Sequence, residues 1–393
     1  MEQEDKDSKT AKKKVSTLVL GILLSLLIIG LIVSKIDYFS KSPVDYKLGE
    51  VAFEFPETRA LYTGVNKDQI IRVTKDGVTA YDIKGQEIWM DTLTLNQLIV
   101  KQKEPYFAIG SMKERKISVF SDKGKEGDIL TEAPVLYFSV NEKGDVATIE
   151  ETKEGHIIGA YDKTGARIHG KRVSYIESAG FPITVEVSPD RTLLLASYLD
   201  IYSPVVTTKL VGVFLNVEEE QAVDNIKFGV EEKDNLVYEI EYIDHNRWVA
   251  IGDKNITYYD QAGQSLKVLE QNNLKYSPYV HSGLGEKYLP ILSNNIQGEK
   301  AVYAKQSLSI FDKEGEIVNK QDFEEAITSF YPDEKGIIIG QGKDYKGFDQ
   351  KGNLRFTFHA TQDIEALRYL GRKLIAITKN EVIHLQVSEE GEN

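Results

Sequence analysis

The segment Tyr81-Asp82-Ile83-Lys84-Gly85 sets the pattern that decides the fold, because copies of it recur along the 393-residue chain. In each copy an alternating run ends in an aromatic residue, Asp, a short turn and Gly follow, and a second alternating run begins. The further copies are Phe120-Ser121-Asp122-Lys123-Gly124, Tyr161-Asp162-Lys163-Thr164-Gly165, Tyr259-Asp260-Gln261-Ala262-Gly263, Phe311-Asp312-Lys313-Glu314-Gly315 and Phe348-Asp349-Gln350-Lys351-Gly352. An Asp beside a Gly of positive φ is typical of a turn, so we expect these Asp residues to be structural.

The marker glycines predict the architecture through their spacing. Successive markers are 39, 41, 98, 52 and 37 residues apart, and the gap of 98 fits two units with a degraded marker at Phe214-Leu215-Asn216-Val217-Glu218. A unit contains four short runs, most clearly at residues 326–330, 337–340, 345–349 and 353–358. The 21 Tyr and 15 Phe also favour strands. A repeat near 40 residues with four strands per unit is the signature of a β-propeller.

Counting the units predicts how the ring closes. Seven units have their own fourth strand, whereas the last, with strands expected at 366–370, 374–378 and 381–387, has no outer strand. Residues 50–55 (EVAFEF) form an alternating run that belongs to no unit, and we expect this run to supply the missing strand and remove the open edge. The predicted fold is therefore all-β, an eight-bladed β-propeller, with seven blades as the alternative if units are miscounted between Gly165 and Gly315.

The N-terminal region predicts a membrane anchor. Residues 15–34 (VSTLVLGILLSLLIIGLIVS) are apolar all round and match the thickness of a bilayer when helical. The run is too long for the apolar region of a cleaved signal peptide, so we predict an uncleaved signal anchor. Four lysines between positions 9 and 14 place the N-terminus in the cytoplasm. The predicted parts are a cytoplasmic tail (1–14), a transmembrane helix (15–34), a tether (35–47), an extracellular β-propeller (48–387) and a polar tail (388–393).

Composition excludes several classes of function. The net charge of −13 disfavours nucleic acid as a partner, because the phosphate backbone would repel the chain. The absence of cysteine excludes disulfides, thiolate metal sites and a cysteine nucleophile. The six histidines are scattered without the spacing of a metal site, and no phosphate-binding loop or serine-hydrolase motif is present. We therefore predict no catalytic residue, no metal site and no cofactor.

The repeat resembles the PQQ-like, or quinoprotein-type, propeller repeat. The resemblance rests on the marker turn and on the outer strand that follows its first copy, Gln86-Glu87-Ile88-Trp89. It implies the propeller architecture but says little about function. Quinoprotein dehydrogenases clamp their cofactor between a Trp and a vicinal disulfide, and this chain has no Cys. The layout also resembles an uncharacterised family of membrane-anchored propeller proteins of Gram-positive bacteria, and exported propellers of this type often serve as interaction scaffolds in envelope assembly.

Departures from the repeat indicate where a protein partner could bind. Two hairpins are long, at residues 198–204 and 293–306, and so are two connections, at 174–182 and 271–285. In a propeller these segments emerge on one face, and aromatic residues are enriched at interfaces. Tolerated loop insertion is the alternative explanation. The candidate partner-binding residues are Tyr175, Phe181, Tyr198, Tyr202, Tyr276, Tyr279, Asn294, Asn295 and Tyr303.

We therefore expect a non-enzymatic, single-pass protein of the cell membrane whose extracellular propeller acts as a scaffold or sensor with an envelope protein partner. One alternative is a small-molecule or sugar-binding sensor, which a deep polar central cavity would favour. The other is a glycan-acting enzyme with its site at the propeller axis. The second strand of each unit is expected near the axis, and the runs at 107–110, 193–196, 249–252 and 337–340 are small and apolar. This pattern disfavours the enzyme.

Overall fold

A computed structural model describes residues 42–216, 225–270, 281–283, 286–295, 305–333 and 335–388. The predicted cytoplasmic tail and transmembrane helix, at residues 1–34, and most of the predicted tether lie outside these ranges, as does 389–393 in the polar tail. Within the described ranges, no helix combines the length and the hydropathy that crossing a bilayer requires. The fold of residues 45–388 is described below.

The described strands form six sheets of four strands and one sheet of eight, and nearly all pair with the next strand in the chain. The first three sheets follow chain order. The first contains β2 (Tyr62–Asn66), β3 (Gln69–Val73), β4 (Gly77–Tyr81) and β5 (Glu87–Thr92). The second contains β6 (Leu98–Lys103), β7 (Tyr106–Ser111), β8 (Lys116–Ser121) and β9 (Gly124–Leu130). The third contains β10 (Val135–Val140), β11 (Val146–Glu151), β12 (His156–Tyr161) and β13 (Arg167–Ser174).

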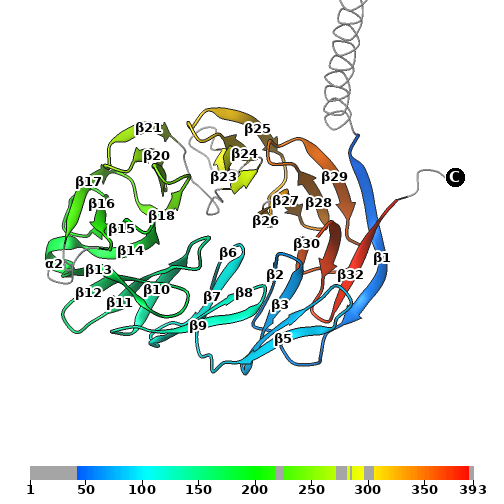
Figure 1. Ribbon diagram of the computed structural model, residues 1–393. Coiled ribbons are helices and arrows are strands. Elements are labelled where there is room, and N and C mark those ends of the chain that lie inside the picture. The colour runs from blue at the N-terminus through cyan, green and yellow to red at the C-terminus, as the bar shows by residue number, and fades with distance from the viewer. Residues whose placement is uncertain are drawn as a thin grey trace, which may run out of the picture. The chain divides into compact units, whose positions relative to one another are not determined.

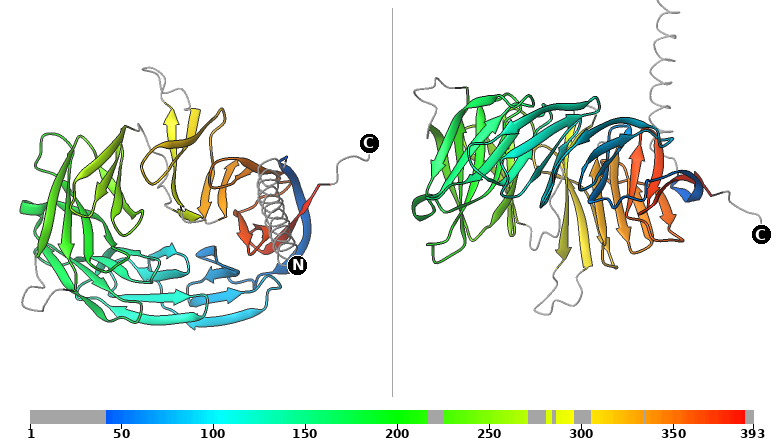
Figure 2. Two further views of the ribbon diagram at one scale, coloured as in Figure 1. Left: turned by 45° about the horizontal axis from the view of Figure 1, so that its top comes forward. Right: turned by 90° about the horizontal axis from the view of Figure 1, so that it is seen from below.

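The next three sheets repeat this arrangement after a short helix, α2 (Ile176–Ala179). The fourth sheet contains β14 (Phe181–Val187), β15 (Leu193–Asp200), β16 (Thr207–Phe214) and β17 (Ile226–Lys233). The fifth contains β18 (Val237–Tyr242), β19 (Arg247–Gly252), β20 (Asn255–Asp260) and β21 (Ser265–Glu270). The sixth contains β22 (His281–Gly283), β23 (Glu286–Asn295), β24 (Lys305–Phe311) and β25 (Ile317–Phe323). Figure 2 shows the sheets following one another around a common centre in chain order.

The eight-stranded sheet joins the two ends of the propeller. Its strand order is β26 (Ser329–Asp333), β27 (Gly336–Gln341), β28 (Asp344–Phe348), β29 (Leu354–His359), β1 (Val44–Glu54), β32 (Glu381–Val387), β31 (Lys373–Ile377) and β30 (Ala366–Leu370). The first strand pairs antiparallel with the last, from Tyr46 opposite Val387 to Glu54 opposite Glu381. The prediction that the run at 50–55 supplies the missing outer strand is confirmed, although the strand begins earlier, at Val44.

The marker turns have the structural role that the sequence predicts. In the first copy, an Asp82 carboxylate oxygen accepts the backbone N–H groups of Lys84 and Gln86 at 2.8 and 2.9 Å, and Gly85 has a φ of 78°. The same pair of hydrogen bonds recurs at the markers Asp162, Asp260, Asp312 and Asp349. These Asp residues stabilise the turns between the third and fourth strands of their groups. They lie in five separate turns, so they do not form one catalytic site.

The second copy of the marker differs in its contacts. There the hydroxyl oxygen of Ser121 accepts the backbone N–H of Lys123 at 3.1 Å, in the place that the Asp carboxylate takes elsewhere. The carboxylate of Asp122 instead forms an ion pair with Lys67 at 3.1 Å. The turn is therefore kept with a different side chain.

The hydrophobic core lies between neighbouring sheets. One cluster joins the third and fourth sheets through Ile149, Ile158, Val185 and Leu194, all nearly inaccessible to solvent. Aromatic rings bridge sheets in the same way, since Trp89 on β5 stacks on Phe120 on β8 with a centroid distance of 5.6 Å. Burial between sheets explains why the second strands are continuous apolar runs.

The predicted order of the strands from the axis outward is wrong in one respect. The runs at 107–110, 193–196, 249–252 and 337–340 belong to β7, β15, β19 and β27, which are second strands. The first strands of the sheets, such as β2, β6, β18, β26 and β30, lie toward the centre, and the fourth strands lie outside (Figure 1). The apolar character of the second strands therefore reflects packing between sheets, and it does not count against a polar site at the axis.

Candidate functional site

Three of the predicted contact residues belong to a group of exposed apolar side chains at one end of the third and fourth sheets. We call this group the 175–206 patch, and it consists of Tyr175, Phe181, Ile201, Tyr202, Val205 and Val206. Their exposed fractions lie between 39% and 64%, which is high for large apolar residues.

Backbone pairing brings the parts of this patch together. Phe181 begins β14 and pairs with Leu199 of β15, two residues before Ile201. The hairpin from β15 to β16 closes with Asp200 opposite Thr207, so residues 201–206 lie beyond this pair. Tyr175 follows the end of β13, where Ser174 pairs with His156, and the His156 ring lies 6.1 Å from the Phe181 ring. The connection and the hairpin therefore meet at the same end of the two sheets.

The other predicted contact residues have different positions. Tyr198 is fully buried on β15, within the cluster that contains Ala179, so its prediction as an exposed contact is wrong. The guanidinium of Arg172 lies 5.4 Å from the centre of its ring. Asn294 and Asn295 end β23, where they pair with Gln306 and Lys305. Tyr276, Tyr279 and Tyr303 lie outside the described residues.

The inner strands carry polar side chains toward the centre of the ring. The ammonium nitrogen of Lys103 on β6 lies 2.5 Å from a carboxylate oxygen of Glu241 on β18. These strands belong to the second and fifth sheets, so the ion pair spans the centre. Lys101, also on β6, donates a hydrogen bond to the Tyr137 hydroxyl at 3.2 Å. Glu186 on β14 is 8% exposed, and its burial, followed by the nearby Glu241 charge, raises the pKa of its carboxyl well above the usual range.

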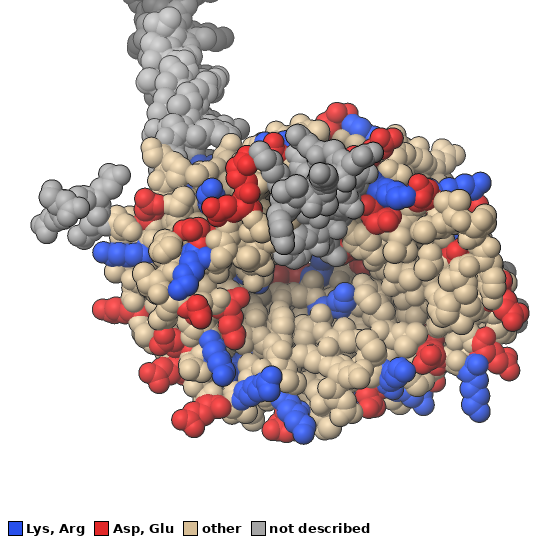
Figure 3. All heavy atoms as spheres, turned by 180° about the vertical axis from the view of Figure 1, so that it is seen from behind, with Lys and Arg blue, Asp and Glu red and all other residues tan. Residues whose placement is uncertain are grey.

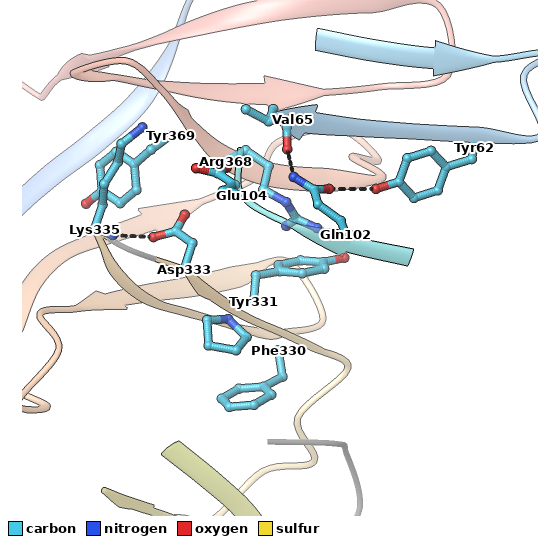
Figure 4. A pocket seen from close by; sticks show the side chains of 11 residues that line it. Tyr62, Val65, Gln102, Glu104, Phe330, Tyr331, Asp333, Lys335, Arg368 and Tyr369 are labelled. Carbon is cyan, nitrogen blue, oxygen red and sulfur yellow. Dashed lines mark hydrogen bonds between the residues drawn. The ribbon is translucent and has the colours of Figure 1, made fainter. Parts of the chain in front are cut away.

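A cavity of about 210 Å³ lies among the inner strands of the first two sheets and the two halves of the eight-stranded sheet. Its lining combines aromatic, amide and charged side chains, most of them labelled in Figure 4. The lining residues are Tyr62, Val65, Gln102, Glu104, Phe330, Tyr331, Pro332, Asp333, Lys335, Arg368 and Tyr369. None of these residues was predicted from the sequence as a site residue, because they come from four separate strands and the segments beside them.

Three interactions hold the cavity wall in place. The guanidinium carbon of Arg368 lies 3.2 Å from the centre of the Tyr331 ring, so the two groups stack. The side-chain amide of Gln102 donates a hydrogen bond to the Val65 carbonyl oxygen at 2.8 Å, and its own oxygen accepts one from the Tyr62 hydroxyl at 3.4 Å (Figure 4). Burial lowers the pKa of Arg368 and raises the pKa of the Tyr62 hydroxyl, as expected for groups removed from water.

Charge on the surface is mixed rather than concentrated. On the side shown in Figure 3, acidic and basic residues alternate around the rim of the ring, and a hollow lies near its centre. Among the described residues, no group of three or more His, Asp or Glu side chains is placed to hold a metal ion. The features that stand out are therefore the 175–206 patch and the central cavity.

Four-stranded antiparallel sheets arranged around a centre, with the last group completed by the first strand, define the protein as a β-propeller. The propeller part of the resemblance seen in the sequence is thus confirmed, whereas the PQQ-like assignment stays a prediction. The chain belongs to a family of unknown function (DUF5711), whose model matches residues 50–387. No curated protein matches the sequence significantly.

Solved structures with a similar fold are remote in sequence. BamB from Moraxella catarrhalis is 12% identical, with a TM-score of 0.46 over 85% of this chain and 98% of that chain. A eukaryotic initiation factor is 11% identical, with a TM-score of 0.49 over 78% of this chain and 80% of the other. Hsv2 from Kluyveromyces lactis is 12% identical, with a TM-score of 0.47 over 78% and 99%. At these identities the likeness concerns the fold and gives no guide to function.

Proposed function

We propose that the protein is a membrane-anchored, extracytoplasmic β-propeller of eight blades that acts as a non-catalytic interaction scaffold, or sensor, in the cell envelope. The uncharged run at 15–34, with its preceding lysines, supports the anchor and its orientation. Seven groups of four consecutive strands, and an eighth formed by β30, β31, β32 and β1, support the number of blades. The eight-stranded sheet is then two blades that meet along their outer strands.

The 175–206 patch is the observation that carries the scaffold role. Tyr202 is 64% exposed and Tyr175 is 50% exposed, and both lie beside exposed Phe181, Val205 and Val206. Exposed apolar side chains gathered at one place are typical of a protein-binding surface, and tyrosines are enriched there. A rigid strand scaffold presents the hairpin and the connection, so a partner would bind a surface that needs little ordering.

The test compares the patch with an equally apolar surface elsewhere. Tyr175→Ser combined with Tyr202→Ser removes the two most exposed rings of the patch. The matched control is Met90→Ser combined with Leu130→Ser, because these side chains are 64% and 69% exposed on the outer strands β5 and β9. Each full-length variant is fused at its C-terminus to a proximity-labelling enzyme and expressed in intact cells.

We expect the patch variant to lose specific labelled neighbours that the wild type and the control retain. Thermal unfolding of the purified variants should show equal midpoints, because exposed substitutions of this kind change stability by no more than about 0.5 kcal/mol. Identical sets of labelled neighbours in the patch variant and the control would reject the patch as the binding surface.

A further inference from the structure

Arg368 lines the central cavity, where its guanidinium is largely removed from water. Among the residues that the structure describes, it forms no ion pair. A guanidinium nitrogen donates a hydrogen bond to the Leu367 carbonyl oxygen at 3.1 Å, and the side chain also forms a hydrogen bond with the side chain of Tyr331. Its planar group stacks on the Tyr331 ring, and Asp333 attracts its charge from beyond ion-pair distance. A guanidinium removed from water is costly unless an anion or several acceptors face it. The guanidinium has more N–H donors than Leu367 and Tyr331 use, so donors remain for a ligand in the cavity.

The acidic side chains in the lining are already engaged. A carboxylate oxygen of Asp333 accepts the backbone N–H groups of Lys335 and Gly336 at 2.7 and 3.1 Å. A carboxylate oxygen of Glu104 accepts the backbone N–H of Lys67 at 3.2 Å. Backbone amides thus compensate part of both negative charges, whereas the charge of Arg368 is offset only in part, by Asp333 beyond ion-pair distance. The cavity therefore favours an anion, although its lining contains equal numbers of acidic and basic residues.

The size and lining of the cavity limit the ligand further. A dry cavity of about 150 Å³ holds one benzene molecule, so the 210 Å³ here suits a molecule with a single ring. Gln102, Asp333 and the tyrosine hydroxyls can exchange hydrogen bonds with a ligand that carries hydroxyl groups. The rings of Phe330 and Tyr369 offer apolar surface beside these polar groups.

We propose that the central cavity binds a small hydroxylated carboxylate of single-ring size, such as a sugar acid, with the carboxylate on the guanidinium of Arg368. Arginine suits this role because its fork of donors matches both oxygens of a carboxylate. Lys335 is exposed and lines the same cavity, so it adds positive charge on the side open to solvent. This site lies on other sheets than the 175–206 patch, and ligand binding here does not depend on the proposed scaffold role.

The experiment measures binding to the full chain in detergent micelles by isothermal titration calorimetry. The probes are D-glucuronate and D-glucose, which share the ring and hydroxyls and differ in the carboxylate. We expect glucuronate to bind at least about tenfold more tightly than glucose, because a hydrogen bond to a charged group is the stronger kind. Equal affinities, or no saturable binding of glucuronate, would overturn the proposal.

Variants then assign the binding to this cavity. Arg368→Gln should weaken glucuronate binding about tenfold or more and leave glucose binding unchanged. Arg172→Gln is the matched control, because Arg172 also lies against a tyrosine ring but belongs to β13 of the third sheet, away from the cavity. This variant should bind glucuronate as tightly as the wild type does. If Arg368→Gln fails to fold, Lys335→Glu provides the test, because Lys335 is exposed and its replacement should not disturb folding. The Lys335→Glu variant should bind glucuronate several-fold more weakly than the wild type. Unchanged glucuronate binding in the folded variants would overturn the assignment.

Discussion

Closure of the ring by β1 gives a prediction that can be worked out from the contacts of Phe55. This residue directly follows β1, is 7% exposed, and packs with Ile70 of the first sheet and with Ile375 and Val382 of the last group. Its backbone N–H donates to the Asn380 carbonyl oxygen at 2.7 Å, and the Arg72 guanidinium lies 4.2 Å from the centre of its ring. Phe55 therefore joins the two ends of the propeller.

Phe55→Ala should destabilise the whole domain. Replacing a buried Phe by Ala costs about 3–5 kcal/mol, and losing the stacked guanidinium adds about 0.5–1 kcal/mol, so we expect about 5 kcal/mol in all. With an unfolding entropy of about 2.1 cal/mol/K per residue over roughly 340 residues, this loss lowers the midpoint of thermal unfolding by about 7 °C. Differential scanning calorimetry of the full chain in detergent measures the shift.

Val51→Ala is the control for this measurement. Val51 lies on the same strand but is 48% exposed, so its truncation should change stability by no more than about 0.5 kcal/mol, which is under about 1 °C. If Phe55→Ala unfolds within about 1 °C of Val51→Ala, β1 does not contribute to the stability of the ring, and the inference of closure is refuted.

The remaining predictions concern a buried carboxyl and the orientation of the chain. Because the pKa of Glu186 is raised in the folded state by burial and by Glu241, the native protein retains a proton that the unfolded chain releases, and stability falls as pH rises above the ordinary carboxyl pKa. In urea unfolding, the stability of Glu186→Gln relative to the wild type should therefore increase as the pH rises above the ordinary carboxyl pKa; a difference that does not change with pH would contradict the assignment. The chain has no cysteine, so Met90→Cys should react with a membrane-impermeant maleimide in intact cells and Ser8→Cys only after lysis; the reverse result would exclude an extracellular propeller.

Local interactions explain which features the sequence predicts well. The marker turn depends on hydrogen bonds between Asp82 and residues two and four positions later, so a short segment of sequence is enough to predict it. Closure was predictable because a count of strands left one unit short and one strand unassigned. The start of β1 at Val44 was not predictable, because residues 44–49 (VDYKLG) have a polar composition that also suits a tether.

Radial position and burial were harder to predict. A short apolar run has the same sequence pattern whether the strand lies at the axis or packs between sheets. The prediction therefore put β7 and β27 at the axis, whereas they are the second strands of their groups. Tyr198 shows a related limit, because the sequence put it in a long hairpin, whereas β15 continues to Asp200 and buries the ring. The central cavity brings Tyr62 beside Arg368, residues about 300 positions apart, and no local pattern predicts such a contact.

The pairing of β1 with β32 has a consequence for how the protein is made. The first strand of the propeller leaves the ribosome before all its other strands, but its partner, Glu381–Val387, is synthesised after all of them. A contact between residues so far apart in sequence forms late, so β1 keeps an unpaired edge until the last strand of the propeller has been synthesised. A truncated or stalled nascent chain would keep that edge exposed, which makes such chains the form most prone to aggregate and to need a chaperone.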